Sequence, residues 1–416
     1  MGVEHMADYR GPLGGVRVID LTRVLAGPYA TTVLADMGAE VIKVEDTGTG
    51  DSTRVTPPLI NGVSNHFMNL NRNKKSVSID LKLPEGRKLL LDLAKNADVV
   101  VANFRPGVLE RLGLDYPNLK AVNPGIILCC ISGFGQDSSY SDKPSFDIIT
   151  QAMSGAMSVT GEAGRPPVRL GVPMGDLSGG LYGAIAILGA LHERTVTGRG
   201  QMIDVSMLDA LVHLMLYYPI DYLNASLKAK AVGGRHEHVA PYGVFEVKDG
   251  YLVLAIFQGK FWRLYCQAIG HPELIKDSRF LESKDRLANR EQLYPILEQV
   301  MVQKTRSEWS AILDDSGIPW APILSPDEVT ALPLMHERQM FVNVDHPIAG
   351  RIRVSGRPIK FPNRSQPPMA PAPLHGQHSR EIVMTIAGRT SEEVLDLERN
   401  GVIRQAAKEP NANVSP

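Results

Sequence analysis

The sequence predicts an α/β fold with a mainly parallel, buried sheet. Short runs rich in Val and Ile indicate buried strands, at residues 16–21, 40–45, 98–102, 125–131 and 201–205. Helical patterns lie between and after them, at residues 29–37, 85–95, 181–191 and 208–218. Turn residues separate the predicted strands from the predicted helices, and Pro84 suits the first position of the helix at residues 85–95. Strands that alternate with helices in this way build βαβ units.

Composition divides the chain into three segments. Residues 1–224 carry the βαβ units and belong to a large domain. Residues 225–333 begin with a loop rich in His and Gly, followed by a hairpin pattern and charged helical stretches, so we expect a smaller α+β domain there. Residues 334–416 hold two short strands around Gly350 and a Pro-rich crossing at residues 362–373. We expect this last segment to pack back on the large domain.

Overall composition points to a small-molecule partner. The formal net charge of −1 over 416 residues provides no basic field for nucleic acid, and the apolar runs are too short or interrupted to span a bilayer. The three cysteines suggest no disulfide framework, which favours a reducing compartment. No targeting pattern is visible at either end, so we expect a cytoplasmic protein, or one of the mitochondrial matrix in a eukaryote.

Asp176 is the most informative single residue. It precedes the small-residue, apolar helix predicted at residues 181–191, where an unpaired carboxylate is costly unless it is used or well hydrogen-bonded. One interpretation is a helix N-cap, in which the carboxylate accepts amide protons of the first turn. The other is a chemical role. The residue alone leaves both open.

Basic residues at loop positions suggest a site for a polyphosphate. A compact turn at residues 71–76 contains Arg72, Asn73, Lys74 and Lys75. Further cations, Arg105 and Arg111, follow the strand predicted at residues 98–102, and ligands of open α/β sheets bind beyond the carboxyl ends of strands. Solvated surface charge is the alternative for each of these cations.

Several other site classes are disfavoured. The loop after the first strand has one glycine, Gly27, where a dinucleotide-binding loop needs three. The pair His236 and His238 lacks a third ligand at helical spacing, so we expect no metal site. No Gly-x-Ser-x-Gly element is present, which disfavours an α/β-hydrolase. Cys129 and Cys130 lie within an apolar strand and suit inert core thiols.

Five ordered motifs give the chain a family likeness. They are Leu-Thr-Arg-Val-Leu-Ala-Gly-Pro at residues 21–28, Gly-Ala-Glu-Val-Ile-Lys-Val-Glu at 38–45, Asn-Arg-Asn-Lys-Lys-Ser at 71–76, Asn-Phe-Arg-Pro-Gly at 103–107 and Gly-Phe-Gly-Gln at 133–136. Together they resemble the class III coenzyme A transferases, the formyl-CoA transferase and CaiB/BaiF family. The likeness runs from about residue 11 to residue 378, and the spacing is similar to the succinyl-CoA:glutarate and hydroxymethylglutarate branch.

The resemblance implies a fold, an assembly and a site. It implies a large domain with a Rossmann-like sheet, built from both chain ends, a small domain between them, and an interlocked homodimer. It implies that CoA and acyl-CoA are substrates, with no permanently bound cofactor, and that Asp176 is the nucleophile. Positions that match or adjoin family CoA contacts are Val24, Leu25, Arg72, Asn73, Lys74, Lys75, Asn103, Phe104, Arg105, Arg111 and Lys143.

The resemblance also carries departures and rivals. Asp46 or Thr47 stands where formyl-CoA transferase has a CoA-binding arginine, which argues against formyl-CoA and oxalate as substrates. An α-methylacyl-CoA racemase of the same fold would need a second acid or base where this chain has Phe146, which cannot transfer a proton. A non-catalytic CoA-binding protein would use Asp176 only as a helix cap.

Overall fold

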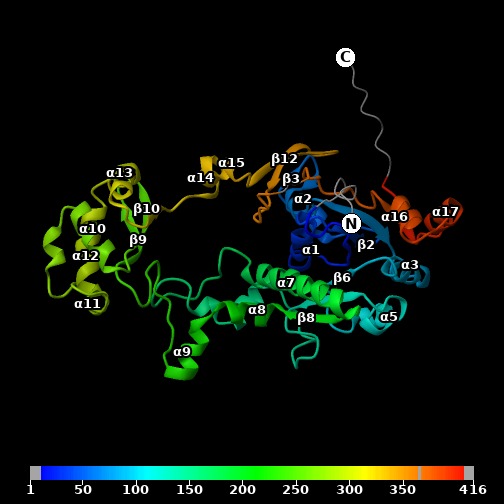
Figure 1. Cartoon of the computed structure of the whole chain (residues 1–416), viewed down its shortest axis with the longest axis horizontal. Coiled ribbons are helices and arrows are strands. Elements are labelled where there is room, and N and C mark those ends of the chain that lie inside the picture. Colours follow the sequence, from blue (N-terminus) through cyan, green and yellow to red (C-terminus); the bar gives the residue numbers. More distant parts are fainter. Residues whose placement is uncertain (1–10, 364–366, 407–416) are drawn as a thin grey trace, which may run out of the picture. The chain divides into compact units, whose positions relative to one another are not determined.

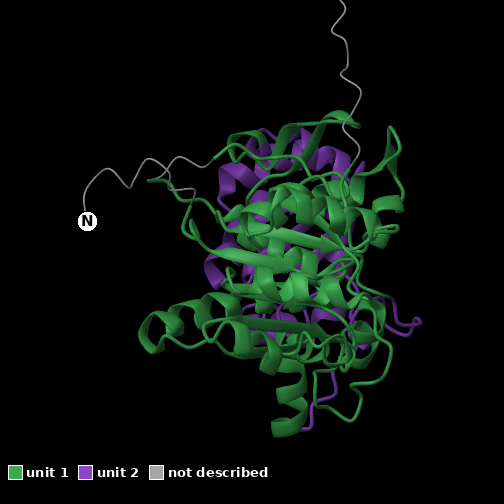
Figure 2. Ribbon diagram, turned by 90° about the vertical axis from the view of Figure 1, so that its right-hand side faces the viewer, with its two compact units in different colours: residues 1–156, 169–225, 336–416 green, residues 157–168, 226–335 purple. Residues whose placement is uncertain are grey.

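A computed structural model of the chain describes residues 11–363 and 367–406, which form two compact units. Unit 1 takes the chain up to Ala156, Arg169–Ala225 and the chain from His336 on (Figure 2). Unit 2 takes Met157–Val168 and Ser226–Met335. Each unit has its own buried core, so each is described separately.

A seven-stranded sheet forms the centre of unit 1, in the order β14-β5-β2-β1-β6-β7-β8 (Figure 1). Six strands are parallel, and β14 runs antiparallel to β5 at one edge. Their bounds are β1 Arg17–Asp20, β2 Glu40–Glu45, β5 Lys74–Ile79, β6 Val99–Ala102, β7 Ile127–Ser132, β8 Met202–Ser206 and β14 Ile403–Arg404. The predicted α/β fold with a mainly parallel sheet is therefore confirmed.

Helices cover both faces of this sheet because successive strand residues point to opposite sides. Val100 packs in one core, whereas its neighbours Val99 and Val101 pack in the other. The first face is covered by α3 Pro84–Ala94, α5 Tyr116–Val122, α16 Ser379–Thr385 and α17 Ser391–Arg399. The second is covered by α1 Ala26–Asp36, α7 Met174–Thr197 and α8 Met207–Leu214. Both faces are thus sealed from water, as parallel strands require.

Shorter elements complete unit 1, and η3 crosses its boundary with unit 2 after Ala156. The predicted helix at residues 208–218 is wrong in its extent: α8 ends at Leu214, and α9 Tyr217–Ala225 begins after Leu216, whose φ of 53° breaks the helix. The remaining elements are η2 Ser52–Val55, β3 Leu59–Ile60, β4 Val63–Ser64, α2 Asn65–Leu70, α4 Val108–Leu112, α6 Asp147–Met153, η3 Ala156–Ser158, β12 Phe341–His346 and β13 Gly350–Ser355.

Unit 2 is a three-stranded antiparallel sheet packed against helices. The strands β9 Tyr242–Val247, β10 Gly250–Ala255 and β11 Trp320–Pro322 lie in the order β11-β10-β9. Trp262, Tyr265 and Trp309 fill the core between this sheet and the helices. The helices are α10 Gly259–Ala268, η4 Pro272–Ile275, α11 Ser283–Ala288, α12 Arg290–Met301, α13 Arg306–Ser316 and α14 Pro326–Ala331, and α15 Pro333–Glu337 follows at the boundary.

The close crossing of α7 and α1 depends on Gly180. A Cβ at this position would lie 2.6 Å from the Ala26 carbonyl oxygen and 3.1 Å from the Tyr29 ring. A backbone oxygen cannot turn aside as a side chain can, so only glycine lets the two helices approach this closely. α7 is also long and apolar enough to span a membrane by length and composition, but its contacts with α1, α8 and the sheet are those of a core helix.

We expect Gly180→Ala to lower the free energy of unfolding by roughly 1–3 kcal/mol, the usual cost of overpacking a core. Gly189→Ala is the matched control on the same helix, because a Cβ there meets nothing within 4 Å. It should stabilise by up to about 1 kcal/mol through helix propensity. Chemical denaturation of both variants measures the difference. Equal effects of the two substitutions would show that the crossing is not tightly packed.

Candidate active site

A cavity of about 230 Å³ opens beyond the carboxyl ends of β1, β6 and β7. Three loops that follow these strands line it, together with the first turn of α7 and Met207 of α8. Seven of the predicted site residues line it: Val24, Leu25, Asn103, Phe104, Arg105, Lys143 and Asp176. The parallel topology explains this meeting, because it brings the carboxyl ends of neighbouring strands to one edge.

Asp176 lies in the first turn of α7, but it is not the cap of that helix. α7 begins at Met174, and its N-cap is Pro173, which has no side-chain acceptor. The capping role falls to Asp147 of α6, whose Oδ1 accepts from the Gly175 amide at 2.8 Å and from the Asp176 amide at 3.3 Å. Within the described chain, the Asp176 carboxylate accepts no hydrogen bond. The helix-cap interpretation of Asp176 is therefore wrong.

The surroundings of Asp176 make it hard to ionise. Burial raises the pKa of Asp176 to about 7, and the nearby Asp147 carboxylate adds to the shift. The positive end of the long α7 helix acts in the opposite direction, because it favours the ionised carboxylate. A half-buried carboxyl with no donors and a pKa near neutrality is a feature of acids that react rather than support a fold.

Side chains hold the backbone of the loop after β1 on three sides. Asn103 accepts from the Arg23 amide and donates to the Arg23 carbonyl, both at 2.8 Å. Asp20 accepts from the Thr22 amide at 2.9 Å, and Lys43 Nζ donates to the Thr22 carbonyl at 2.9 Å. Both the oxygen and the nitrogen of the Asn103 side chain thus bond the loop backbone, which fixes the shape of the loop at the cavity.

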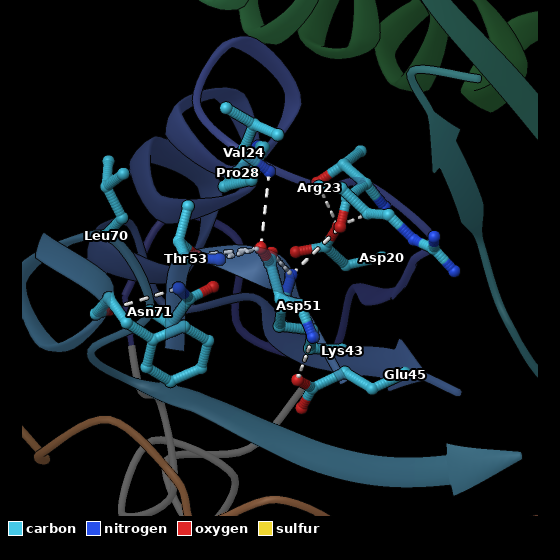
Figure 3. Close-up of polar contacts among 12 residues, drawn as sticks. Asp20, Arg23, Val24, Pro28, Lys43, Glu45, Asp51, Thr53, Leu70 and Asn71 are labelled. Atoms are coloured by element: carbon cyan, nitrogen blue, oxygen red, sulfur yellow. Dashed lines mark hydrogen bonds and ion pairs between the residues drawn. The ribbon is translucent and has the colours of Figure 1, made fainter. Parts of the chain in front are cut away.

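A buried network of charges supports this loop from below. Lys43 Nζ lies 2.9 Å from Asp51 Oδ2, and Lys74 Nζ lies 3.0 Å from Asp20 Oδ2. Burial alone would raise the pKa of Asp20, but Lys74 and Lys43 outweigh it and lower this pKa to about 2. Figure 3 shows how Asp20, Lys43 and Asp51 point toward one another and toward the loop backbone.

Val24 is the strained residue that this network holds in place. Its φ is 68°, in the left-handed region that β-branched residues rarely adopt. Its amide points to Asp51 Oδ1 at 3.5 Å, and its side chain stays 41% exposed at the cavity. Strain of this kind persists where the surroundings impose it, and it is concentrated at functional sites.

The structure separates the predicted cations into two groups. Arg105 and Lys143 line the cavity, and exposed Arg111 reaches back toward Gly107 in the loop after β6. The turn at residues 71–76 does not line the cavity. Arg72 pairs with Asp36, as does the side chain of Asn73, whereas Lys74 is buried against Asp20 and Lys75 pairs with Glu40 and Glu381.

Sequence reasoning missed two residues of the site. Arg23 lines the cavity, with its guanidinium 5.5 Å from the Phe104 ring and 3.9 Å from Asp46. The sequence could have predicted Arg23, because Arg23 follows β1 just as Arg105 follows the neighbouring strand β6. Asp147 was not identified as a site residue, because its contact with α7 joins residues 28 and 29 positions apart.

The glycines around Asp176 serve packing rather than the open cavity. A Cβ at Gly175 would meet Thr150 and Asp147, and one at Gly179 would meet Met207. The lack of a Cβ at these positions therefore serves the packing of α7 rather than the approach of a ligand.

Other candidate groups carry no comparable chemistry. Burial raises the pKa of the Cys130 thiol to about 12, and that of Cys129 further still. His236 Nδ1 accepts from the His238 amide, and the described residues contain no group of three metal-ligating side chains. A larger hollow of about 630 Å³ lies in unit 2, but the Arg235–Glu298 ion pair crosses its lining.

Comparison with known proteins places this site in a family. The profile of CoA-transferase family III matches residues 13–379. The chain is 38% identical to succinyl-CoA:glutarate CoA-transferase of Mus musculus, over 96% of this chain and 92% of that protein. It is 35% identical to succinate–glutarate CoA-transferase of Agrobacterium fabrum, over 91% of this chain and 96% of that protein.

A solved structure gives the same answer. The crystal structure of a CaiB/BaiF family protein from Brucella suis superposes with a TM-score of 0.81 at 36% identity, covering 90% of this chain and 98% of that one. The cavity, its carboxylate and these similarities agree with the resemblance in the sequence motifs. The chain is a member of CoA-transferase family III, the CaiB/BaiF family, and is a CoA-transferase.

Proposed function

We propose that this enzyme moves CoA between an acyl-CoA and a free carboxylic acid with Asp176 as the nucleophile. The observation that carries the proposal is the Asp176 carboxylate, which lines the cavity without a hydrogen-bond donor from the described residues. A carboxylate that has lost its solvent is more reactive than one in water. Its pKa of about 7 still leaves a large ionised fraction at neutral pH.

The proposed reaction conserves the thioester bond energy in two covalent steps. An Asp176 oxygen attacks the acyl-CoA carbonyl, the carbon–sulfur bond breaks, and a mixed anhydride and CoA thiolate result. The thiolate then attacks the aspartyl carbonyl, which releases the donor's acid and leaves an aspartyl-CoA thioester. The acceptor acid runs the same steps in reverse. No proton is needed from a further side chain, which fits a cavity lined by Asp176 and cations.

We propose succinyl-CoA as donor and a dicarboxylate as acceptor. The names of several relatives pair succinyl-CoA or succinate with glutarate, mesaconate or citramalate. The cations Arg23, Arg105 and Lys143 give the cavity a positive lining that suits substrates with several negative charges. The racemase alternative is weaker, because Phe146 lines the cavity where a second acid or base would be needed.

We further propose that Arg23, Arg105, Arg111 and Lys143 bind the phosphates of CoA. Within the described chain, Arg105, Arg111 and Lys143 form no ion pair, and Lys143 Nζ lies 3.5 Å from the centre of the Tyr140 ring. No carboxylate therefore competes with a ligand for these three charges. Val24, Leu25 and Phe104 would supply the apolar contacts beside them. Residues 72–75, predicted for the same role, are already occupied by Asp36, Asp20, Glu40 and Glu381.

We also propose a homodimer, with the chains interlocked as the resemblance implies. α9 has no buried residue, although it carries large apolar side chains. Ile220, Tyr222 and Leu223 on this helix are 51–72% exposed. Exposed apolar side chains continue on α7 and α8, including Leu181, Ile185 and Leu214. Large apolar side chains that gather on a protein surface in this way mark an association surface. The compartment we propose is the cytoplasm, or the mitochondrial matrix in a eukaryote, where its three free cysteines stay reduced.

The phosphate assignment predicts different effects for two basic residues. Arg105→Ala should raise the KM for succinyl-CoA by roughly tenfold or more and change the KM for glutarate little, since lost charge-assisted bonds weaken the ligand that used them. Lys75→Ala is the matched control, because its ammonium is paired with Glu40 and Glu381. Initial-rate kinetics with both substrates tests this. A larger effect of Lys75→Ala on succinyl-CoA would restore the original assignment of the 71–76 turn.

The dimer predicts that dilution to nanomolar concentration gives no folded monomer, because the chains support each other's exposed apolar faces. Sedimentation with an activity assay measures this. Ile220→Lys together with Leu223→Lys should cause loss of the folded protein. A stable, active monomer of the unaltered chain would contradict the assembly.

The nucleophile predicts opposite effects of Asp176→Asn on activity and stability. Transfer from succinyl-CoA to glutarate should fall by several orders of magnitude, because no covalent route remains. Stability should be unchanged below about pH 3.8 and higher than that of the unaltered enzyme above pH 7, because the raised pKa of Asp176 destabilises the fold only where the carboxyl is ionised. Thermal melts across pH measure the second effect.

The control is Asp209→Asn, an exposed carboxylate in the first turn of α8. It should change neither transfer nor the pH profile of melting. If Asp176→Asn kept substantial activity, the nucleophile would have to be another residue.

A further inference from the structure

Asp147 has an arrangement that its capping role alone does not require. It is the first residue of α6, and its carboxylate holds the first turn of a different helix, α7. Its second oxygen, Oδ2, accepts from Gln151 Nε2 at 2.6 Å. Gln151 is fully buried and accepts from the Leu170 amide at 2.9 Å. Asp147 and Gln151 therefore tie the segment that leads into α7 to α6, with the Asp147 charge fixed beside Asp176.

We propose that Asp147 is a positioning residue whose negative charge favours the acylated, uncharged form of Asp176 during CoA transfer. The proposal rests on the function proposed above. In the net half-reaction, the Asp176 carboxylate and an acyl-CoA give an aspartyl-CoA thioester and a free carboxylate. One negative charge thus leaves Asp176 and departs with the acid. Repulsion between two neighbouring carboxylates ends when one is acylated, so a fixed Asp147 charge favours the covalent state.

Neutral groups could cap α7 as well, which makes the choice of a carboxylate informative. Ser, Thr and Asn also supply an acceptor for helix amides, without placing a charge beside the nucleophile. The Asp147 carboxylate instead adds to the rise in the pKa of Asp176 that burial produces. Charged groups of the other elements that pack against or line the cavity with α7 are Asp36, Asp204, Asp209, His213, Arg23, Arg105 and Lys143. None of these is a source of that shift, whereas Asp147 is.

Asp147→Asn removes the charge, while its amide oxygen can still accept from the Gly175 and Asp176 amides. It also loses the hydrogen bond from Gln151 Nε2, so a second variant must remove that bond alone. At pH 8, with excess succinyl-CoA and a fixed concentration of free succinate, the ratio of aspartyl-CoA enzyme to free enzyme should fall by about tenfold, the effect of one pKa unit of coupling. Intact-protein mass spectrometry measures this ratio. The acidic limb of the kcat/KM profile should also move to lower pH, because Asp176 becomes easier to ionise.

Gln151→Met is the matched control. It removes the hydrogen bond to Asp147 Oδ2 but keeps the Asp147 charge, so it should lower stability without moving the acidic limb or the adduct ratio downward. A purely structural role predicts instead that both variants lose rate and keep the unaltered pH profile and adduct ratio, and this result would overturn the proposal. An unaltered enzyme without any aspartyl-CoA adduct would contradict the proposed function itself, a separate and recognisable outcome.

Discussion

The contact between α7 and the first turn of α1 is the constraint on which the site depends. α1 begins directly after the loop that carries Arg23 and Val24, and α7 begins two residues before Asp176. Gly180 lets the two helices meet at the Ala26 carbonyl, so one contact sets the separation of the nucleophile from the loop. With any larger residue at position 180, the helices would have to move apart, and the cavity between their first turns would open.

Polar side chains hold the site in place, and each one satisfies particular backbone groups by hydrogen bonding. Lys43 and Asp20 hold the carbonyl and the amide of Thr22, and Asn103 holds both backbone groups of Arg23. Val24 can then remain at a φ of 68° without a glycine's freedom. Asp147 satisfies the first amides of α7, which frees Asp176 from that task. The reactive carboxylate is left without a partner because other side chains do the structural work.

Local patterns predicted the sheet well because parallel, buried strands leave a clear signal. β2 agrees with its predicted bounds, and five of the six parallel strands were visible in the sequence; β5 was not, because its first residues, Lys74 and Lys75, were assigned to a basic turn. Asp176 and the cavity residues after β1 and β6 were within reach, since their motifs follow strands. The position of the 71–76 turn outside the cavity could not be predicted, because its side chains pair with residues such as Asp36 and Glu381 that only the folded chain brings near. Asp147 was missed for the same reason.

An oxygen-isotope experiment tests the central claim, that the Asp176 carboxylate is acylated in turnover. When an acceptor acid labelled with heavy oxygen attacks the aspartyl-CoA thioester, one labelled oxygen bridges the anhydride and remains on Asp176 after CoA departs with the acyl group. Mass spectrometry of the peptide that spans Asp176 should show one heavy oxygen after a single turnover with labelled glutarate and succinyl-CoA, and up to two after many turnovers. Productive transfer with no label in that peptide, or with label on another carboxylate, would contradict the account.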